Sequence, residues 1–275
     1  MPELPEVETV CRGLAPVLVG QVIVRADVRR KDLRKPFPRG LKTRVESAQV
    51  THITRRAKYI QVHLDNGYVL VIHLGMSGRI VFHPHDYRPQ THDHFILHMQ
   101  GGQQIVLNDP RRFGIVDLVA ADDLESHVLF SHLGPEPLSN GFSGPVLAMA
   151  LKGKKAAIKQ VIMDQTVVVG VGNIYASEAL FMAGIHPEMP AGAIDAGRLE
   201  TLVSAIKTVL KKAIKAGGST LRDHRQANGE LGYFQHSFSV YDREGQSCGT
   251  CGGRHKIQRI VQGGRATYFC PQCQK

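Results

Sequence analysis

The chain has 275 residues, a length that suits two domains and allows a substantial core. Apolar residues make up 43% and charged residues 21%, as in ordinary globular proteins, and no run of about 18 apolar residues could span a membrane. A net charge of +10 and a pI near 9.5 indicate a polyanionic partner, and nucleic acid is a commoner one than a membrane surface. The first residues lack the pattern of a signal peptide, so we expect a cytoplasmic protein.

The first ten residues, MPELPEVETV, combine a helix start with two reactive groups. Apolar residues at 7, 10, 11, 14, 17 and 18 predict an amphipathic helix that begins at residue 2 or 3. Once Met1 is removed, Pro2 carries a terminal amine that titrates near roughly pH 8 and can attack an electrophilic carbon to form an iminium. Glu3, next to this amine, can act as the proton donor or acceptor in that reaction. Because proline and glutamate also favour a first helical turn, a purely structural interpretation stands beside the catalytic one.

Seven short segments after this helix alternate apolar and polar residues, which predicts an antiparallel sandwich or barrel up to about residue 130. Asp65-Asn66-Gly67 and Gly101-Gly102 supply hairpin turns. The expected strands are 21–28, 58–64, 68–74, 79–83, 95–99, 104–107 and 115–119. In the second of these, Lys58 falls on the apolar side, which should face inward. Its amine therefore either reaches out to solvent or lines a site.

Proline and glycine are frequent in residues 133–145, which we interpret as a linker before a helical second half. We expect helices at 155–163 and 174–182, the latter capped by Asn173, and a longer helix that ends at Gly217-Gly218. The Gly170-Val171-Gly172 turn lacks the third glycine and the strand–helix–strand context of a dinucleotide-binding fingerprint. It suits either phosphate binding at a helix start or a plain helical hairpin.

The four C-terminal cysteines have the spacing of a zinc site. Cys248 and Cys251 are two residues apart, 18 residues follow, and Cys270 and Cys273 repeat the pair. Four thiolates fill a tetrahedral structural site, whereas disulfides would require an oxidising compartment. The fifth cysteine, Cys11, lies on the apolar stripe of the first helix and is expected in the core.

Two strands at 256–262 and 266–269 are expected between the cysteine pairs, with Arg265 in the turn at the tip. A basic residue at this tip is suited to contact phosphates. Five histidines lie between residues 83 and 98, at 83, 85, 92, 94 and 98. No carboxylate or cysteine pattern supports a second metal there, and a position of His92 or His94 near nucleic acid is favoured.

Seven motifs are spread in order along the whole chain. They are MPELPEVETV, Arg56-Ala57-Lys58-Tyr59, His73-Leu74-Gly75-Met76-Ser77-Gly78, Asn108-Asp109-Pro110-Arg111-Arg112-Phe113-Gly114, His132-Leu133-Gly134-Pro135-Glu136-Pro137, Val169-Gly170-Val171-Gly172-Asn173-Ile174-Tyr175-Ala176-Ser177-Glu178 and the four-cysteine finger. Together they resemble the bacterial formamidopyrimidine-DNA glycosylase family. The opening Pro2-Glu3-Leu4 also resembles this branch more than the sister endonuclease VIII group, which typically opens with Pro-Glu-Gly.

The resemblance implies a bifunctional DNA glycosylase and abasic-site lyase of base excision repair, which removes oxidised purines such as 8-oxoguanine and formamidopyrimidines and cleaves the strand by β,δ-elimination. Pro2 resembles the family nucleophile, which forms a Schiff base with the sugar. Glu3 resembles the acid that protonates the ring oxygen of the sugar. Lys58 resembles the proton donor in β-elimination, and Arg265 resembles the finger arginine that holds a phosphate and serves δ-elimination.

Further residues resemble the DNA contacts of the family. Met76, Arg111 and Phe113 match the trio that enters the duplex where the flipped nucleotide was, which agrees with the need to refill the stack. His92, Arg111 and Lys155 match DNA contacts, and Asn173 is expected to grip phosphates together with Lys58 and Arg265. Residues 219–233 match the loop that caps the lesion, where His224 replaces an expected aromatic ring.

The implied fold is α+β with two domains: an N-terminal antiparallel β-sandwich with a leading catalytic helix, and a helical domain with a helix-two-turns-helix motif and a zinc-finger β-hairpin. We expect boundaries at 1–132, 133–145 (linker), 146–238 and 239–275 (zinc finger). The implied cofactor is one structural Zn²⁺, and the partner is double-stranded DNA containing oxidised bases, bound by a monomer in the cytoplasm. Two alternatives remain: an endonuclease VIII-like glycosylase for oxidised pyrimidines, and a non-catalytic zinc-finger DNA-binding protein.

Overall fold

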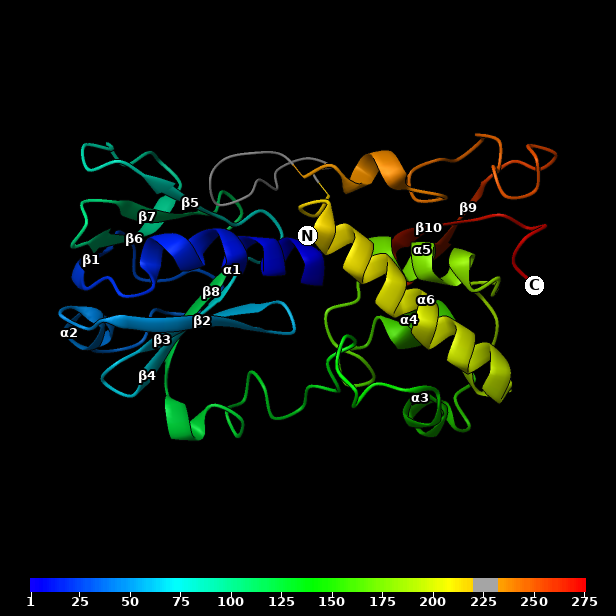
Figure 1. Ribbon diagram of the computed structural model, residues 1–275, viewed down its shortest axis with the longest axis horizontal. Coiled ribbons are helices and arrows are strands. Elements are labelled where there is room, and N and C mark those ends of the chain that lie inside the picture. Colours follow the sequence, from blue (N-terminus) through cyan, green and yellow to red (C-terminus); the bar gives the residue numbers. More distant parts are fainter. Residues whose placement is uncertain (220–231) are drawn as a thin grey trace. The chain divides into compact units, whose positions relative to one another are not determined.

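The computed structural model describes residues 1–219 and 232–275, which form two compact units (Figure 1). The first unit consists of Met1–Ser131 with Ala216–Tyr233, and the second of His132–Lys215 with Phe234–Lys275. The predicted boundaries at 132, 145 and 238 remain predictions. His224 and most of the predicted capping loop, 219–233, lie outside the described residues.

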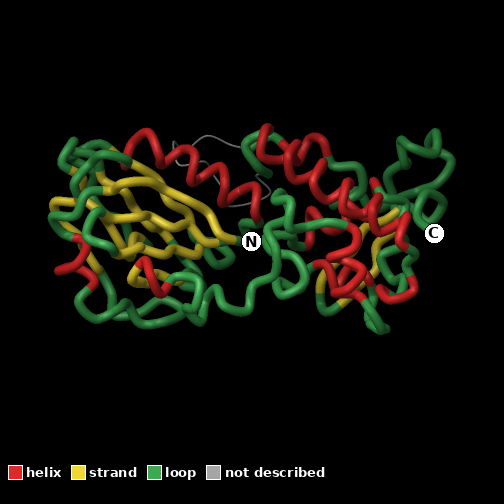
Figure 2. Tube along the Cα trace, turned by 60° about the horizontal axis from the view of Figure 1, so that its bottom comes forward, coloured by secondary structure: helices red, strands yellow, loops and turns green. Residues whose placement is uncertain are grey.

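The first unit has a long helix and two four-stranded antiparallel sheets. Helix α1 (Leu4–Leu18) presents its apolar stripe to a core shared with both sheets, and Figure 2 shows it lying along the strands. One sheet has the order β1 (Ile23–Val28), β6 (Asp93–Met99), β7 (Gln104–Asn108), β5 (Arg79–His83). The other has the order β2 (Val50–Arg56), β3 (Tyr59–Leu64), β4 (Tyr68–His73), β8 (Ile115–Ala120). Two short helices, α2 (Leu41–Val45) and η1 (Ala121–Asp123), complete the unit. The predicted sandwich with a leading helix is confirmed.

The predicted strands of this unit all exist, but the sequence did not reveal β2. Its sequence, VTHITRR, has only two aliphatic residues, so the alternation is weak, and only Val50 is buried. The prediction that Lys58 begins a strand is wrong. Ala57 has φ 53°, a left-handed conformation that forms a tight turn, and β3 begins one residue after Lys58.

The second unit is helical and ends in a hairpin. It contains α3 (Gly144–Leu151), α4 (Ile158–Ile162), α5 (Asn173–Met182), α6 (Ala196–Lys215), the short helices η2 (Ala191–Ala193) and η3 (Phe234–Ser237), and the paired strands β9 (Gln258–Gln262) and β10 (Arg265–Phe269). The apolar face of α6 packs against α3 and α5. Helices α4 and α5, with the two turns between them, form the predicted helix-two-turns-helix motif. Of the described helices, none is long and apolar enough to cross a membrane.

Two helix predictions in this unit need correction, and α3 was not predicted. The helix predicted at 155–163 begins only at Ile158, because Ala157 is extended and pairs with Pro190. Lys155 therefore lies in the exposed turn that precedes α4. Asn173 is not the cap of α5: Gly172 occupies that position, and the Asn173 side chain forms other bonds.

Candidate active site

The N-terminus of α1 is fixed by a buried carboxylate. Met1 is exposed, whereas Pro2 and Glu3 are buried. Glu3 is the N-cap, and its backbone N–H donates to Glu6 Oε2 at 2.9 Å, which is the spacing of a capping box. The other oxygen, Glu6 Oε1, accepts from the backbone N–H and the hydroxyl of Ser219, at 2.8 and 3.0 Å. One side chain thus ties the start of the helix to the residue that follows Gly217-Gly218.

Main-chain contacts hold the residues on either side of 220–231 together. The backbone N–H of Tyr233 donates to the carbonyl of Ala216 at 3.1 Å. A Cβ atom on Gly232 would clash with the carbonyl oxygen of Gly218, so only glycine fits there. Gly218 itself has φ +80° and lies against the Glu6 side chain, which also requires glycine. We call these residues, 216–219 and 232–233, the neck.

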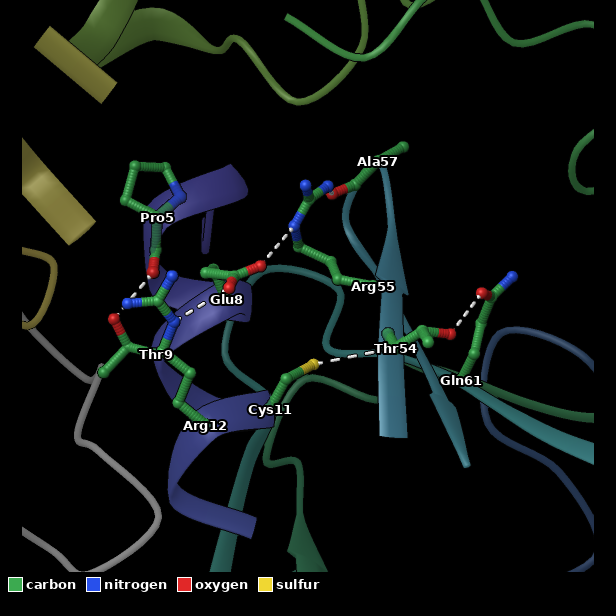
Figure 3. Close-up of polar contacts among 9 residues, drawn as sticks. All are labelled: Pro5, Glu8, Thr9, Cys11, Arg12, Thr54, Arg55, Ala57 and Gln61. Atoms are coloured by element: carbon green, nitrogen blue, oxygen red, sulfur yellow. Dashed lines mark hydrogen bonds and ion pairs between the residues drawn. The ribbon is translucent and has the colours of Figure 1, made fainter. Parts of the chain in front are cut away.

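A second network ties α1 to the turn that carries Lys58 (Figure 3). Glu8 of α1 accepts from Arg55 Nε at 3.0 Å, and Arg55 Nη1 donates to the carbonyl of Ala57 at 2.8 Å. The Arg55 side chain is only 9% exposed, so this ion pair is better shielded than a surface pair. Lys58 follows directly and is 7% exposed, which excludes the interpretation that its amine extends into solvent.

Cys11 is in the core, as predicted. Its thiol lies 3.7 Å from the carbonyl of Thr54, as Figure 3 shows. Burial, and next the charge of Glu8, raise the pKa of Cys11 to about 12, so the thiol stays protonated and unreactive at neutral pH.

His73, at the end of β4, is electrostatically coupled to Lys58. Burial is the main cause that lowers the pKa of His73 to about 4, and the charges of Lys58 and Arg34 add to it. Its Nδ1 accepts from the backbone N–H of Gly75 at 3.0 Å, which agrees with a neutral ring. The region around Lys58 therefore contains a neutral imidazole at physiological pH.

This shift predicts an acid-sensitive contribution to stability. Well above pH 6.5 the His73 ring is neutral in the folded and in the unfolded chain. As the pH falls toward 4, the unfolded chain binds a proton on this ring and the folded chain does not. We expect this to lower the free energy of unfolding by roughly 2 kcal/mol between pH 6.5 and 5. Urea unfolding at both pH values should show a smaller pH dependence for His73→Gln than for the wild type. Equal dependences would contradict the assignment.

Three predicted DNA contacts of the first unit gather on two adjacent loops. Met76 and Phe113 are each 42% exposed, which is unusual for large apolar side chains. The guanidinium carbon of Arg111 lies 4.9 Å from the centre of the Phe113 ring, a cation–π contact. Gly75, with φ 63°, packs so closely on the Phe113 carbonyl group that a Cβ would clash. His92 is exposed, and its carbonyl accepts from the backbone N–H of Asp109 at 2.9 Å, so it borders the same loops.

Asp109 fixes the two loops relative to each other. It is fully buried, and Oδ1 accepts from the Ser77 hydroxyl at 2.7 Å while Oδ2 accepts from the Gly114 N–H at 2.8 Å. The Ser77 hydroxyl in turn accepts from the backbone N–H of Arg111 at 3.2 Å. Between these anchors Arg112 adopts φ 59°. The carboxylate thus holds the loop of Met76 against the loop of Arg111 and Phe113.

The second unit brings Asn173 and the Arg265 hairpin together. Gly263 and Gly264 both have positive φ, as a two-residue hairpin turn requires, and Arg265 follows, exposed and paired with Gln262. Asn173 Nδ2 donates to the carbonyl of Ala266 at 2.9 Å. The predicted position of Arg265 at the hairpin tip is thus borne out to within one residue. Lys155 is exposed beside a shallow hollow that Lys154, Gln160 and Asp164 also line.

The four predicted zinc ligands converge in this unit. Their sulfur atoms lie within 4.8 Å of one another, with Cys248 and Cys273 3.8 Å apart and Cys251 and Cys270 4.0 Å apart. Four sulfurs bound tetrahedrally to zinc at about 2.3 Å would be about 3.8 Å apart, so these residues fit the ion. The site is structural, because all four ligand positions are filled by the protein.

Several residues in these networks were not identified from the sequence. Glu6 could have been found, because a glutamate three residues after the N-cap is the capping-box signal. Asp109 lies within one of the seven motifs, but the motif does not predict that this aspartate is buried. Ser219 carries no signal that distinguishes it from other serines, and His73 also lies within one of the seven motifs, which does not predict the low pKa of its ring.

Comparison with known proteins agrees with this arrangement. Three family models match: the formamidopyrimidine-DNA glycosylase N-terminal domain at residues 1–116, the formamidopyrimidine-DNA glycosylase H2TH domain at 133–225, and the zinc finger found in FPG and IleRS at 245–275. The chain is 51% identical to the formamidopyrimidine-DNA glycosylase of Azorhizobium caulinodans and 50% identical to that of Dinoroseobacter shibae, with all of each chain covered.

Solved structures are similar over the same length. A complex of Lactococcus lactis Fpg with DNA containing an abasic site has a TM-score of 0.91 at 34% identity, with 99% of both chains covered. The MutM (FPG) protein from Thermus thermophilus has a TM-score of 0.89 at 39% identity, covering 99% of this chain and 98% of that one. The fold and these comparisons define a two-domain α+β protein with an N-terminal sandwich, a helix-two-turns-helix motif and a four-cysteine zinc finger. The chain belongs to the formamidopyrimidine-DNA glycosylase family.

Proposed function

We propose that this protein is a DNA glycosylase and abasic-site lyase of base excision repair that removes oxidised purines from duplex DNA. The observation that carries the proposal is the N-terminus, where a buried Pro2 and a buried Glu3 sit at the start of a helix that two networks hold in place. The name shared by the relatives favours oxidised purines over oxidised pyrimidines. We place the activity in the bacterial cytoplasm, at the nucleoid, and expect a monomer.

The chemistry divides among residues of the two units. After removal of Met1, the Pro2 amine attacks the anomeric carbon of the sugar as the base leaves, and the resulting iminium retains the sugar. Glu3 protonates the ring oxygen. Lys58 supplies a proton during β-elimination, and Arg265 of the second unit holds a phosphate and serves δ-elimination.

The remaining proposed contacts hold the DNA. Met76, Arg111 and Phe113 enter the duplex at the flipped nucleotide: the thioether and the phenyl ring replace lost stacking, and Arg111 hydrogen-bonds the orphaned cytosine. His92, Lys155 and Asn173 contact the backbone, where the positive charge of the protein makes affinity salt-dependent. The zinc ion, when bound, has no chemical step and only fixes the finger.

Covalent trapping tests the proposal. Because an iminium is reducible, borohydride should link the protein to DNA that contains 8-oxoguanine opposite cytosine, in an amount equal to the active protein. Glu3→Gln is the matched control: it should bind the same DNA with little base release. If active protein yields no adduct, the Pro2 mechanism is wrong. Preferential trapping on oxidised pyrimidines would favour the endonuclease VIII-like alternative, and DNA binding without base release would favour a non-catalytic protein.

Asp109→Asn is predicted to impair lesion recognition. An amide has one oxygen, so it cannot accept from both the Ser77 hydroxyl and the Gly114 N–H, and an unsatisfied buried group costs about 1–3 kcal/mol. We expect excision from duplex DNA to fall at least about tenfold, because Met76, Arg111 and Phe113 lose their fixed geometry. Single-turnover excision rates measure this. Asp122→Asn, at an exposed aspartate of the same unit, should leave the rate unchanged. A wild-type rate for Asp109→Asn would contradict the assigned role.

A further inference from the structure

Lys159 is a buried cation in the second unit. Its side chain lies on α4 and is 1% exposed, although lysine is rarely found fully buried. An ammonium group has three N–H donors and no acceptor. Here Nζ donates to Asn173 Oδ1 at 2.6 Å, to Thr267 Oγ1 at 2.7 Å and to the carbonyl of Ala266 at 3.3 Å.

These contacts determine which way the Asn173 amide faces. Because an ammonium only donates, the atom that faces it must be Oδ1, and Nδ2 must point the other way. Nδ2 then donates one N–H to the carbonyl of Ala266 at 2.9 Å. Nδ2 carries a second N–H. The distance from Nδ2 to Tyr241 Oη is 3.5 Å, which is long for a hydrogen bond, so a phosphate oxygen can replace this contact. Without Lys159 the amide could turn over and present its oxygen instead, which would repel a phosphate.

The same ammonium anchors the finger strand that carries Arg265. Ala266 and Thr267, the two residues after Arg265 in β10, both accept from Lys159, and Thr267 is fully buried. The carbonyl of Ala266 accepts from both Lys159 and Asn173. Because Lys159 also donates to the Asn173 side chain, its buried ammonium fixes the start of β10 against the start of α5. Asn173 and Arg265 are the phosphate contacts proposed above for this unit.

We propose that Lys159 is a positioning residue for phosphate binding: its ammonium orients the Asn173 amide and the first residues of β10 so that Asn173 and Arg265 present their donors to the DNA backbone. The proposal rests on the proposed function, since it assigns a role in holding the DNA that Pro2 and Glu3 act upon. It does not place Lys159 in contact with DNA or with the reacting atoms.

A double-mutant cycle tests this proposal. Lys159→Met keeps the length of the side chain and removes its donors, and we expect affinity for duplex DNA containing a tetrahydrofuran abasic analogue to fall about ten- to a hundredfold, the worth of a hydrogen bond to a charged group. Asn173→Ala should produce a similar loss, and the double variant should be little weaker than either single variant, because both remove the same contact. Lys212→Met, which removes a charge from an exposed position on α6, should bind like the wild type. Zinc content and melting temperature are measured for every variant.

Asn173→Asp provides a test that leaves Lys159 in place. The carboxylate would pair with the ammonium and offer no donor to phosphate, so we expect an unchanged or higher melting temperature together with weaker DNA binding than Asn173→Ala. Wild-type binding by a folded, zinc-loaded Lys159→Met, losses that add in the double variant, or stronger binding by Asn173→Asp than by Asn173→Ala would each overturn the proposal. Borohydride trapping by the wild type is scored separately: its failure would reject the proposed function and not the coupling of Lys159 to Asn173.

Discussion

A protein that keeps Met1, or that carries an extra residue ahead of Pro2, is expected to bind damaged DNA and to release no base from it. The retained residue converts the Pro2 nitrogen from an amine into a tertiary amide, whose lone pair is delocalised and is not nucleophilic. Strand cleavage of an 8-oxoguanine duplex measures excision, and fluorescence anisotropy with the tetrahydrofuran duplex measures binding. We expect excision to fall to background, while affinity changes by less than about tenfold because the phosphate contacts come from other residues.

The extended protein contains its own control. Removing the added residues with a protease so that the chain begins at Pro2 should restore both base release and borohydride trapping. The structure agrees with a loss of excision that leaves binding intact. Met1 is 56% exposed whereas Pro2 is buried, so the added residues can extend into solvent without displacing α1. Normal excision by a protein whose mass shows an intact extension would eliminate Pro2 as the nucleophile.

Loss of zinc is expected to be the second large effect. The hairpin has a small apolar core, formed by Val240, Ile257 and Tyr268 with two of the cysteines, and cannot hold its shape by burial alone. Cys251→Ser should release the ion and unfold the finger, since metal binding at such sites contributes directly to folding. Arg265 then loses its fixed position. We expect affinity for the tetrahydrofuran duplex to fall at least about tenfold and the slope of log affinity against log salt to decrease by about one.

Cys11→Ser is the matched control for this experiment. It makes the same substitution at a buried cysteine of the first unit, whose sulfur lies near the carbonyl of Thr54 and is not one of the four clustered thiols. Zinc content, measured by atomic absorption, should remain at one ion per chain, and the salt slope should not change. Full affinity in a zinc-free Cys251→Ser protein would show that the finger does not contribute to binding.

The regular elements could be predicted from the sequence because short-range patterns specify them. The hairpin turns at Gly67 and Gly102, the apolar face of α6 and the cysteine spacing were all visible in the order of residues. Strand β2 was not, because its two aliphatic residues, Val50 and Ile53, are three positions apart and do not fit the two-residue period of a strand. Helix α4 was predicted too long, because the extended conformation of Ala157 results from pairing with Pro190, more than 30 residues away.

The proposed site was predictable only in part, for a related reason. Pro2, Glu3, Lys58 and the four cysteines stand out because their residue type is unusual for their position. Glu6, Asp109 and Lys159 act through bonds to residues 213, 32 and 108 positions away, and no local pattern encodes such partners. Burial gives these residues their importance, and burial of a polar side chain is a property of the folded chain.

The neck has a consequence for how this protein can diversify. Its contacts are Glu6 with Ser219, Gly218 with Gly232, and the main-chain bond between Tyr233 and Ala216, and none of them involves a side chain from 220–231. An exchange of residues 220–231 between relatives, His224 included, would leave both partners of each of these contacts in the chain. Such a chimaera tests directly whether the exchanged residues alter the choice of lesion while the start of α1 keeps its anchor on Ser219.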